Sequence, residues 1–283
     1  MLDDWRVVVV LPAYNAAATL ERTVREIDRD VVDEILLVDD ASTDETTFIA
    51  RRLGLRCITH ETNLGYGGNQ KTCYAAALDA GADIVVMVHP DYQYSPRLVR
   101  PMVAMIASGH YDLVLGSRVL AQNSVSQGMP RYKYVANRLL TLTENLLLHQ
   151  KLSEYHTGLR AFSADLLRAL PLDRNSDDFV FDNQVIAQAV AVGARIGEVS
   201  CPTRYEPESS SISFRRSVRY GFGVLATAAA FSLHRAGLRD APFLGVGPAA
   251  FDPPSRPAAP VAAPGPSLED GPRDRVASAH PAG

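Results

Sequence analysis

The chain has 283 residues, 47% hydrophobic and 21% charged, a balance typical of a globular protein with one large domain or two small ones. Its formal net charge of −4 gives no whole-chain reason to bind nucleic acid. The three cysteines lack metal-type spacing, which fits a reducing compartment, and the N-terminus carries acids where an export signal needs positive charge. We therefore expect a cytoplasmic protein with no nucleic-acid partner.

Short β-branched runs alternate with helix-like stretches through the first 120 residues. Five runs are predicted as strands, namely Val7–Leu11, Glu34–Val38, Leu55–Thr59, Ile84–Val88 and Leu113–Leu115. Four helices are predicted between them, namely Ala17–Arg29, Glu45–Leu53, Lys71–Ala80 and Leu98–Ser108. Buried strands separated by helices indicate an α/β fold with a Rossmann-like, mainly parallel central sheet and helices on both faces. Ligands bind such sheets at the carboxyl ends of the strands.

The pattern changes in the second half of the chain, where a long helix is predicted at Tyr132–His149, another at Phe179–Ala191 and a short strand at Ile196–Val199. We divide the chain into an α/β domain (1–212), a basic and apolar C-terminal helix (213–240) and a disordered tail (241–283). The tail holds ten prolines and ten alanines with little aromatic content. Such a composition cannot offset the entropy cost of ordering.

The segment Ser209–Arg239 holds five arginines and no acid around the uncharged run Tyr220–Leu233. This run is shorter than the roughly 18–20 residues that a membrane-spanning helix needs. Two interpretations stay open. The segment could lie in a membrane interface, with arginines at both ends, or pack on the core as an ordinary helix with solvated ends.

The ends of the first two predicted strands carry candidate ligand-binding residues. They are Pro12, Tyr14, Asn15, Asp39 and Asp40. A carboxylate directly after a buried strand stands at the ligand-binding edge of the sheet, where it can hydrogen-bond a base or ribose. The alternative is helix capping by the segment that follows, Ser42-Thr43-Asp44-Glu45. Both can hold, because the two aspartates precede the cap.

A glycine-rich stretch, Asn63-Leu64-Gly65-Tyr66-Gly67-Gly68-Asn69, follows the third strand and opens a helix. Gly67 and Gly68 would let backbone N–H groups approach a diphosphate closely, and a helix N-terminus favours that anion. The spacing matches neither a dinucleotide fingerprint nor a P-loop, so a plain turn is the alternative.

The fourth strand is followed by His89, Asp91 and Gln93, whose side chains point to one side if the chain stays extended. An imidazole, a carboxylate and an amide oxygen suit Mn²⁺ or Mg²⁺. The alternative is a polar turn forced by Pro90 and Pro96.

These motifs, together with Gly116-Ser117-Arg118, resemble in order and spacing the family 2 glycosyltransferases of the GT-A fold, from roughly Val7 to Ile212. Within that family the chain is similar to the dolichol-phosphate mannosyltransferase and polyprenyl-phosphate sugar transferase group. The resemblance implies an inverting enzyme that moves a sugar from a UDP or GDP donor to a polyprenyl phosphate or glycan acceptor. It also implies that the first strand end and Asp39 hold the nucleoside, while the Asp91 site holds a metal on the diphosphate.

Two positions depart from the pattern of the family. Ala16 stands where many relatives have an acid, and His89 replaces the first acid of the usual Asp-x-Asp motif. A non-catalytic nucleotide-sugar binding protein is therefore one alternative. A sugar-phosphate nucleotidyltransferase is another, although Pro12-Ala13-Tyr14-Asn15 is not the glycine- and arginine-rich loop that such enzymes place after the first strand.

The second half supplies candidates for the reaction itself. Asp182 and Asp178 are the candidate general bases for a hydroxyl acceptor, whereas a lipid phosphate is already ionised and needs no base. Basic groups would neutralise donor or acceptor phosphates. The predicted basic residues are Arg118, Arg131, Lys133, Arg160 and Arg215, with a solvated helix end as the alternative for Arg131 and Lys133. A polyprenyl phosphate acceptor would place the enzyme at the inner face of the plasma membrane.

Overall fold

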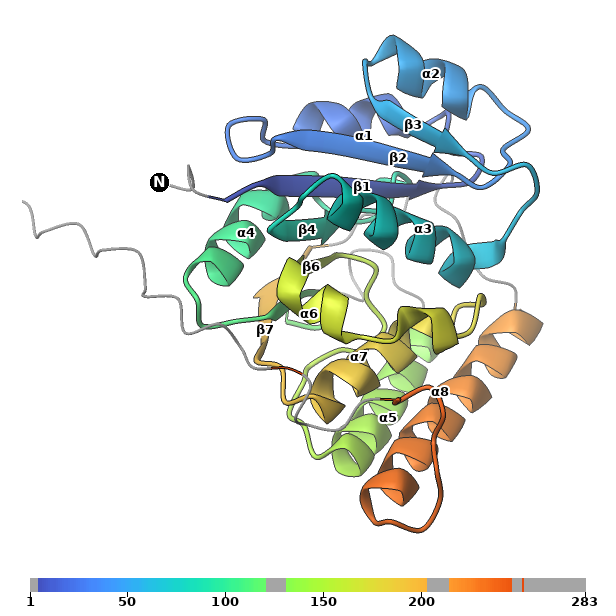
Figure 1. Ribbon diagram of the computed structural model, residues 1–283. Helices are drawn as coiled ribbons and strands as arrows, with labels where there is room; N and C mark the ends of the chain where they lie inside the picture. Colours follow the sequence, from blue (N-terminus) through green and yellow to red (C-terminus); the bar gives the residue numbers. More distant parts are fainter. Residues whose placement is uncertain (1–4, 121–130, 203–213, 246–250, 252–283) are drawn as a thin grey trace, which may run out of the picture.

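A computed structural model describes residues 5–120, 131–202, 214–245 and 251. Its described part contains one seven-stranded sheet in the order β3-β2-β1-β4-β6-β5-β7 (Figure 1). The strands are β1 (Val7–Ala13), β2 (Glu34–Asp39), β3 (Arg56–Thr59), β4 (Ile84–Met87), β5 (Leu113–Ser117), β6 (Arg160–Ser163) and β7 (Ile196–Ser200). Only β6 is antiparallel to its neighbours β4 and β5. The predicted mainly parallel α/β sheet is confirmed.

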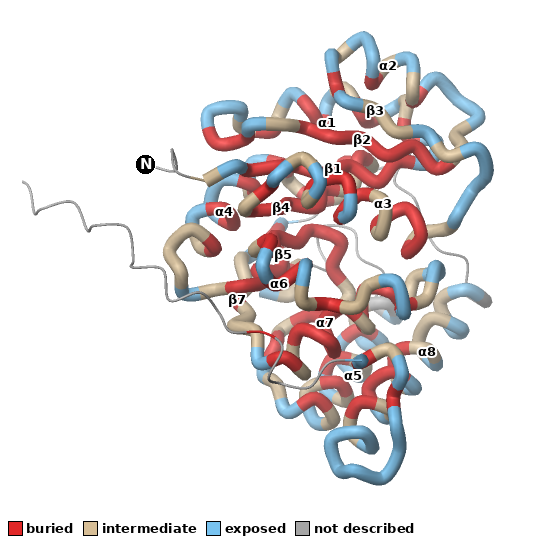
Figure 2. The backbone as a smooth tube through the Cα atoms, in the orientation of Figure 1, coloured by how far each residue is buried: buried red, intermediate tan, exposed pale blue. Residues whose placement is uncertain are grey.

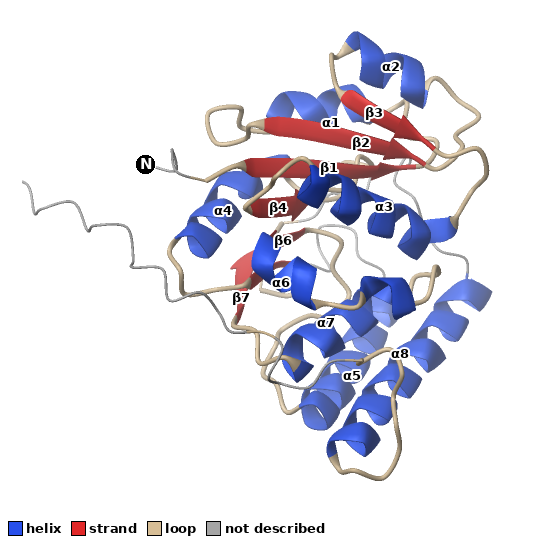
Figure 3. Cartoon of the chain, in the orientation of Figure 1, coloured by secondary structure: helices blue, strands red, loops and turns tan. Residues whose placement is uncertain are grey.

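The helices of the described residues are shown in Figure 3. They are α1 (Leu20–Glu26), α2 (Thr46–Arg52), α3 (Gly65–Asp79), α4 (Val99–Ala107), α5 (Arg131–Leu148), α6 (Ala164–Ala169), α7 (Phe181–Ala191) and α8 (Phe214–Arg235), with 3-10 turns η1 (Pro96–Leu98) and η2 (Leu172–Arg174). Two features differ from the sequence-based expectation. The short elements β6 and α6 were not predicted, and α3 begins at Gly65 rather than at Lys71, so the glycine-rich stretch is helical.

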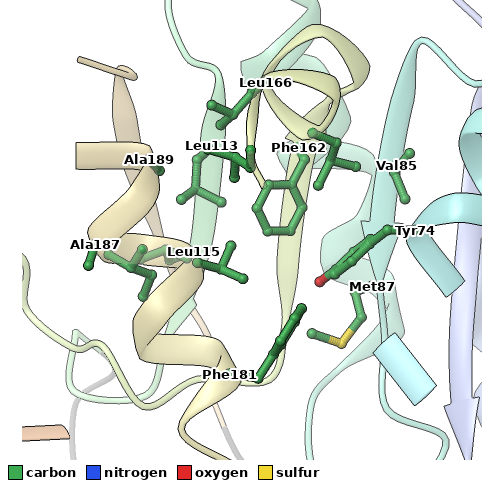
Figure 4. Close-up of a cluster of buried hydrophobic side chains, with 14 of the residues drawn as sticks. Tyr74, Val85, Met87, Leu113, Leu115, Phe162, Leu166, Phe181, Ala187 and Ala189 are labelled. Carbon is green, nitrogen blue, oxygen red and sulfur yellow. The ribbon is translucent and has the colours of Figure 1, made fainter. Parts of the chain in front are cut away.

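Helices cover both faces of the sheet because successive side chains of each strand point to opposite sides. In β1, Val8 and Val10 pack into the cluster under α3, α6 and α7, whereas Val7 and Val9 pack under α1, α2 and α4. Figure 4 shows the first cluster, in which Tyr74 of α3 and Phe181 of α7 meet the strand side chains. The α3 and α7 helices are thereby fixed at the strand ends where the site lies.

The helices α5 and α8 lie side by side at one end of the sheet, and α8 also contacts α7 (Figure 1). One face of α8 is buried through Val224, Ala228 and Phe231, while other positions of both helices are exposed (Figure 2). One face of α8 therefore packs on the core, as one of the two interpretations of this segment predicts. A membrane contact of its exposed face stays a prediction. Within the described segments, no helix is long and apolar enough to cross a membrane.

The disordered tail predicted at 241–283 includes residues that the structure buries in the core. Ala241 and Leu244 are buried in the core cluster beside α7, and Phe251 joins them. The apolar side chains of this stretch find a partner surface that composition alone does not reveal. The remainder of the predicted tail lies outside the described residues.

Candidate active site

The carboxyl ends of β1, β2 and β4 meet at one edge of the sheet, as parallel pairing requires. Because β6 runs the other way, its first residue, Arg160, also lies at this edge, paired with Met87 at the end of β4. The antiparallel strand therefore brings the second half of the chain to the site formed by the first half.

Asp39 ends β2 and is only 1% exposed. Its Oδ2 accepts a hydrogen bond from the Ser42 backbone N–H (3.0 Å), while its Oδ1 has no partner among the described residues. A buried carboxylate oxygen without a donor is costly, so the position calls for a donor from outside the chain. A nucleoside N–H or hydroxyl group has the required chemistry.

Asp40 is also buried, and both oxygens of its carboxylate are hydrogen-bonded within the protein. It accepts from the Leu64 N–H (2.8 Å) and the Gly65 N–H (3.0 Å), and it lies 2.8 Å from Nδ1 of His60. These bonds tie the start of α3 to the end of β2. Three of the roughly four acceptor sites of this carboxylate are thus used within the protein, and a donor contact of Asp40 remains a prediction.

The first strand end is held by the loop after β2. The Asn15 N–H donates to Oγ of Ser42 (2.8 Å), and Oδ1 of Asn15 accepts from the Thr43 N–H (2.9 Å). The Tyr14 ring is 56% exposed and free to cover a ligand, whereas Pro12 is buried inside β1. Donor binding by this strand end remains a prediction.

Gly67 and Gly68 pack closely against the loop before α7. The Gly67 N–H donates to the Asp177 carbonyl (2.7 Å), and a Cβ atom at Gly67 would lie 2.4 Å from the Ser176 carbonyl oxygen. A Cβ atom at Gly68 would lie 2.9 Å from Cβ of Leu64. The Gly67 N–H is therefore not available to a diphosphate. The predicted approach of this N–H group to the donor does not occur in the structure.

A chain of hydrogen bonds links His89, Tyr66 and Asp182. The Tyr66 hydroxyl donates to Oδ2 of Asp182 (2.7 Å) and lies 3.0 Å from Nε2 of His89. Because the single hydroxyl proton goes to Asp182, the Tyr66 oxygen accepts from Nε2–H of His89. Burial lowers the pKa of His89, against the opposing effect of Asp91, so the ring is neutral and its Nδ1 carries the lone pair.

The imidazole of His89 is fixed in place by its neighbours. The Tyr66 ring stacks on it with centroids 5.4 Å apart. A Cβ atom at Gly158 would lie 2.4 Å from Cδ2 of His89, so only glycine fits beside that edge of the ring. The Gly158 N–H in turn donates to the Tyr94 hydroxyl (3.0 Å). Nδ1 lies on the opposite edge of the His89 ring, away from Gly158.

Asp182, in the first turn of α7, is held by three donors. They are the Tyr66 hydroxyl, Nε2 of Gln70 (3.1 Å) and Nη1 of Arg160 (3.2 Å). The Asp182 carboxylate therefore holds Tyr66, Gln70 and Arg160 in place. The general-base role predicted for Asp182 would require it to give up one of these bonds.

Arg160 is not placed to bind a phosphate, which corrects the prediction. Its side chain is fully buried, and besides Asp182 its donors reach the carbonyl oxygens of Thr157 (2.9 Å) and Tyr155 (3.4 Å). A buried guanidinium needs such complete pairing. Arg160 therefore joins the segment before β6 to α7.

Arg118 follows β5 and pairs with the buried Glu154. Its Nε donates to Oε1 of Glu154 (2.8 Å), its backbone N–H donates to Oε2 (2.7 Å), and its Nη2 donates to the His156 carbonyl. Asn137 of α5 also donates to Glu154 (2.8 Å). Arg118 thus lies near the site with its guanidinium already engaged, and its catalytic role remains a prediction.

The predicted metal ligands follow β4 on a turn rather than on an extended chain, since residues 90–93 form a turn and bend in which Tyr92 has a φ of 58°. The polar turn that was the alternative is therefore present, and metal binding by these side chains remains a prediction. Oδ1 of Asp91 accepts from the Gln93 backbone N–H (3.1 Å), and the charge of Asp91 acts on His89. No group of three His, Cys, Asp or Glu side chains that could hold a metal occurs in the part of the chain that the structure describes. A cation here would take few protein ligands and complete its shell with diphosphate oxygens and water, as Mg²⁺ commonly does.

Four predicted residues remain, one exposed and three with undescribed side chains. Asp178 is exposed before α7, where its Oδ1 accepts from the Phe179 N–H (2.8 Å). The side chains of Arg131, Lys133 and Arg215 lie outside the described residues.

Sequence reasoning assigned no role to Tyr66, Gln70 or Glu154. Tyr66 and Gln70 stand one helical turn apart on α3, and this spacing is the signal that could have paired them. Glu154 had no such signal, because its partner Arg118 is 36 residues away in sequence.

Comparison with known proteins gives a family match over more than half of the chain. The sequence profile of Glycosyl transferase family 2 matches residues 8–170. A UDP-N-acetylglucosamine--dolichyl-phosphate N-acetylglucosaminyltransferase of Methanococcus voltae is 28% identical over 221 residues, which cover 72% of this chain and 88% of that protein. An undecaprenyl-phosphate mannosyltransferase of Micrococcus luteus is 29% identical over 202 residues, 69% of this chain and 82% of that protein.

A solved structure supports the fold. Glucosyl-3-phosphoglycerate synthase from Mycobacterium tuberculosis, in complex with Mn²⁺, UDP-glucose and phosphoglyceric acid, superposes with a TM-score of 0.60 at 22% identity. The match covers 84% of this chain and 82% of that one. The predicted GT-A architecture is thereby confirmed.

Proposed function

The chain belongs to glycosyl transferase family 2 and is a glycosyltransferase, and on that premise we propose that it transfers a sugar from a UDP or GDP donor to a polyprenyl phosphate. The observation that carries the donor half of this proposal is Oδ1 of Asp39, a buried carboxylate oxygen at the ligand-binding edge of the sheet that has no partner within the described ranges of the chain. The two alternatives considered for the sequence, a non-catalytic module and a nucleotidyltransferase, do not fit the family.

The nucleoside would bind against the ends of β1 and β2. Oδ1 of Asp39 would accept a hydrogen bond from the base or ribose, and the exposed ring of Tyr14 would cover the ligand. The end of β1 at Asn15 is already joined to the loop after β2, because Oδ1 of Asn15 accepts two hydrogen bonds from Thr43. This part of the site is therefore formed before the donor arrives.

His89 and Asp91 would hold the divalent cation, Mn²⁺ or Mg²⁺. The structure fits this role, because Tyr66 and Asp182 fix the tautomer of His89 and leave Nδ1 as the available ligand atom. A metal-bound histidine commonly donates its other N–H in this way. The ion, when bound, would neutralise charge on the departing nucleoside diphosphate.

The chain's own residues would then align the acceptor for a single displacement that inverts the anomeric centre. A phosphate acceptor is ionised at neutral pH, so no side chain has to remove a proton. This agrees with Asp182, whose carboxylate is occupied by Tyr66, Gln70 and Arg160. Arg131, Lys133 and Arg215, whose side chains lie outside the described residues, remain the proposed phosphate contacts.

The acceptor class is supported by the names of the two relatives, which describe sugar transfer to dolichyl phosphate and undecaprenyl phosphate. A lipid acceptor places the reaction at a membrane surface, and we propose the inner face of the plasma membrane, in glycan or cell-envelope biosynthesis.

The proposal is tested by incubating the purified chain with radiolabelled UDP- and GDP-sugars, Mn²⁺ and a short-chain polyprenyl phosphate. We expect label to move into the organic phase with one nucleotide only, and the product to have inverted anomeric configuration by NMR. Transfer to a soluble glycan but not to the lipid phosphate would overturn the acceptor assignment and leave the donor assignment standing.

A further inference from the structure

The α5 helix exposes its apolar side and buries polar groups. Five large apolar side chains on it are between 54% and 68% exposed: Tyr132, Val135, Leu139, Leu142 and Leu146. Their spacing of three and four residues places them in one stripe along the helix. The buried positions of the same helix include the polar residues Asn137, Thr141 and Glu144. A surface helix normally does the reverse, so the exposed stripe needs a partner surface.

The neighbouring helix α8 presents a second apolar stripe. Val218, Phe222 and Leu233 are exposed, with Phe222 at 70%, while Val224 and Phe231 on the opposite face are buried. The two helices are in contact, and a Cβ atom at Gly221 would lie 3.9 Å from Cδ1 of Leu140. We name the exposed side chains of both helices the α5–α8 face.

The charges of this face have one sign. The only acid in α5 and α8 is Glu144, which is buried, whereas the chain as a whole has a net charge of −4. The exposed basic residues on the two helices include Arg138, Arg216, Arg219 and Arg235. By helical spacing Arg138 neighbours Val135 and Leu142, and Arg219 neighbours Phe222. Apolar side chains beside arginines, without exposed carboxylates on either helix, match the interface of an anionic bilayer.

A second copy of the chain fits this face less well. Two-fold pairing places the same patch opposite itself, so arginines would meet arginines with no acid on the face to pair them. From this charge pattern we propose that the α5–α8 face docks on the surface of an anionic phospholipid bilayer. The inference rests on the proposed function, and it assigns the membrane contact to α5 as well as to the C-terminal helix.

The two helices that carry the docking face also contact the site, through their inward-facing sides. Tyr220 of α8 lies 2.9 Å from Nδ1 of His156, and Asn137 of α5 donates to Glu154. The segment that contains these two partners leads directly to Gly158, which packs on His89. Docking through α5 and α8 therefore places the site beside the headgroups, where the phosphate of a polyprenyl acceptor lies.

Vesicle co-sedimentation of the full chain tests the proposal, with vesicles of phosphatidylcholine alone or mixed with phosphatidylglycerol. We expect binding to the mixed vesicles that weakens with salt. The double variant Leu139→Asp/Leu142→Asp should bind at least about tenfold more weakly, since it removes two apolar anchors from positions that are already exposed. The matched control is Phe48→Asp, which alters an equally exposed side chain on α2 and should bind as wild type does.

Two further measurements separate the outcomes. Light scattering in solution gives the oligomeric state: a wild-type dimer that the double variant converts to monomer would identify a second copy as the partner and overturn the proposal. Wild-type binding that ignores phosphatidylglycerol, or a double variant that binds as tightly as wild type, would also overturn it.

Transfer assays distinguish this inference from the proposed function. The double variant should lose activity on a polyprenyl phosphate embedded in vesicles and keep it on a short-chain, water-soluble analogue. If wild type transfers sugar to neither acceptor, the proposed function fails, whereas vesicle binding still decides the docking face on its own.

Discussion

Oε2 of Glu144 on α5 lies 3.3 Å from Nε2 of His156, and neither of these buried atoms has a hydrogen-bond partner among the described residues. Asn183 donates to the other oxygen of Glu144 (2.7 Å), and the Tyr220 hydroxyl donates to Oδ1 of Asn183 (2.8 Å). The Tyr220 proton is thereby used, so Nδ1–H of His156 must be the donor to Tyr220. Nε2 then carries a lone pair 3.3 Å from Oε2 of Glu144, so a proton on Glu144 would complete a ring of four side chains with Asn183, Tyr220 and His156.

The direction of both pKa shifts agrees with this ring. Burial raises the pKa of Glu144 to about 8, and burial lowers the pKa of His156 to about 4. Both groups are therefore neutral at pH 7. The ring ties α5, α7 and α8 to the segment before β6 without a buried charge.

The first prediction is a loss of stability above pH 6.5. The folded chain keeps the Glu144 proton up to about pH 8, whereas the unfolded chain releases it near 4.5, so the Glu144 contribution is complete below 4.5 and disappears through pH 8. His156 contributes in the opposite sense, but only between about 4 and 6.5. From pH 6.5 to 8 the free energy of unfolding should fall by on the order of 2 kcal/mol. Urea denaturation at several pH values measures it.

The variant Glu144→Gln is the control for that prediction. Glutamine accepts from Asn183 and donates to His156 as a protonated glutamate does, so the ring stays closed without a titrating group. Its stability should change little between pH 6.5 and 8. An equal loss in wild type and variant would show that another group causes the pH dependence.

Asp39→Asn and Asp40→Asn should have opposite effects although the residues are adjacent. Asp39→Asn removes the unpaired carboxylate oxygen, so nucleotide affinity should fall at least about tenfold while stability changes little. Asp40→Asn removes an acceptor from the loop that starts α3, so stability should fall by about 1–3 kcal/mol. Calorimetric titration with UDP and GDP and thermal melts of both variants distinguish the two roles. Equal nucleotide affinity in Asp39→Asn and wild type would exclude the proposed nucleoside contact.

Asp91→Asn should remove the dependence of nucleotide binding on metal. Wild type should be stabilised more by nucleotide with Mn²⁺ than by nucleotide with EDTA, because His89 and Asp91 would hold an ion that neutralises the diphosphate. The variant should show the smaller, EDTA-like shift under both conditions. The measurement is a thermal-shift series. A wild-type shift that EDTA leaves unchanged would argue against a metal at this position.

Tyr66→Phe should weaken metal binding by about 10- to 100-fold, the usual cost of losing a partner that orients a metal-bound histidine. The variant leaves His89 free to take either tautomer and removes one donor from Asp182. Electron paramagnetic resonance of Mn²⁺ titrated with protein and donor measures the affinity. Tyr111→Phe, at the opposite end of the sheet, serves as the control.

Arg160→Met should destabilise the fold rather than raise the KM for the acceptor. The substitution leaves Asp182 buried without its counter-charge, for which losses of about 3–5 kcal/mol are typical. The soluble yield and the melting temperature should both fall. A variant that folds normally but has a raised KM for the lipid phosphate would restore the phosphate-binding role that the sequence suggested.

The sequence by itself determined the layout of the sheet and much of one half of the site. Buried runs such as Val7–Leu11 and Glu34–Val38 match β1 and β2 to within two residues at the ends, because a strand covered on both faces must be apolar throughout. For the same reason the residues after each run, among them Asp39 and His89, could be assigned to one edge before their contacts were known.

Only the tertiary structure decided what those residues do. Asp39 and Asp40 are alike in sequence, but both oxygens of Asp40 are bonded to the start of α3 and His60, whereas one oxygen of Asp39 has no partner among the described residues. Arg160 looked like a phosphate ligand until β6 placed it in the core. Whether a charged group is buried and paired depends on partners far away in the chain, such as Asp182 for Arg160. The residues next to it in sequence do not show which distant partner will reach it.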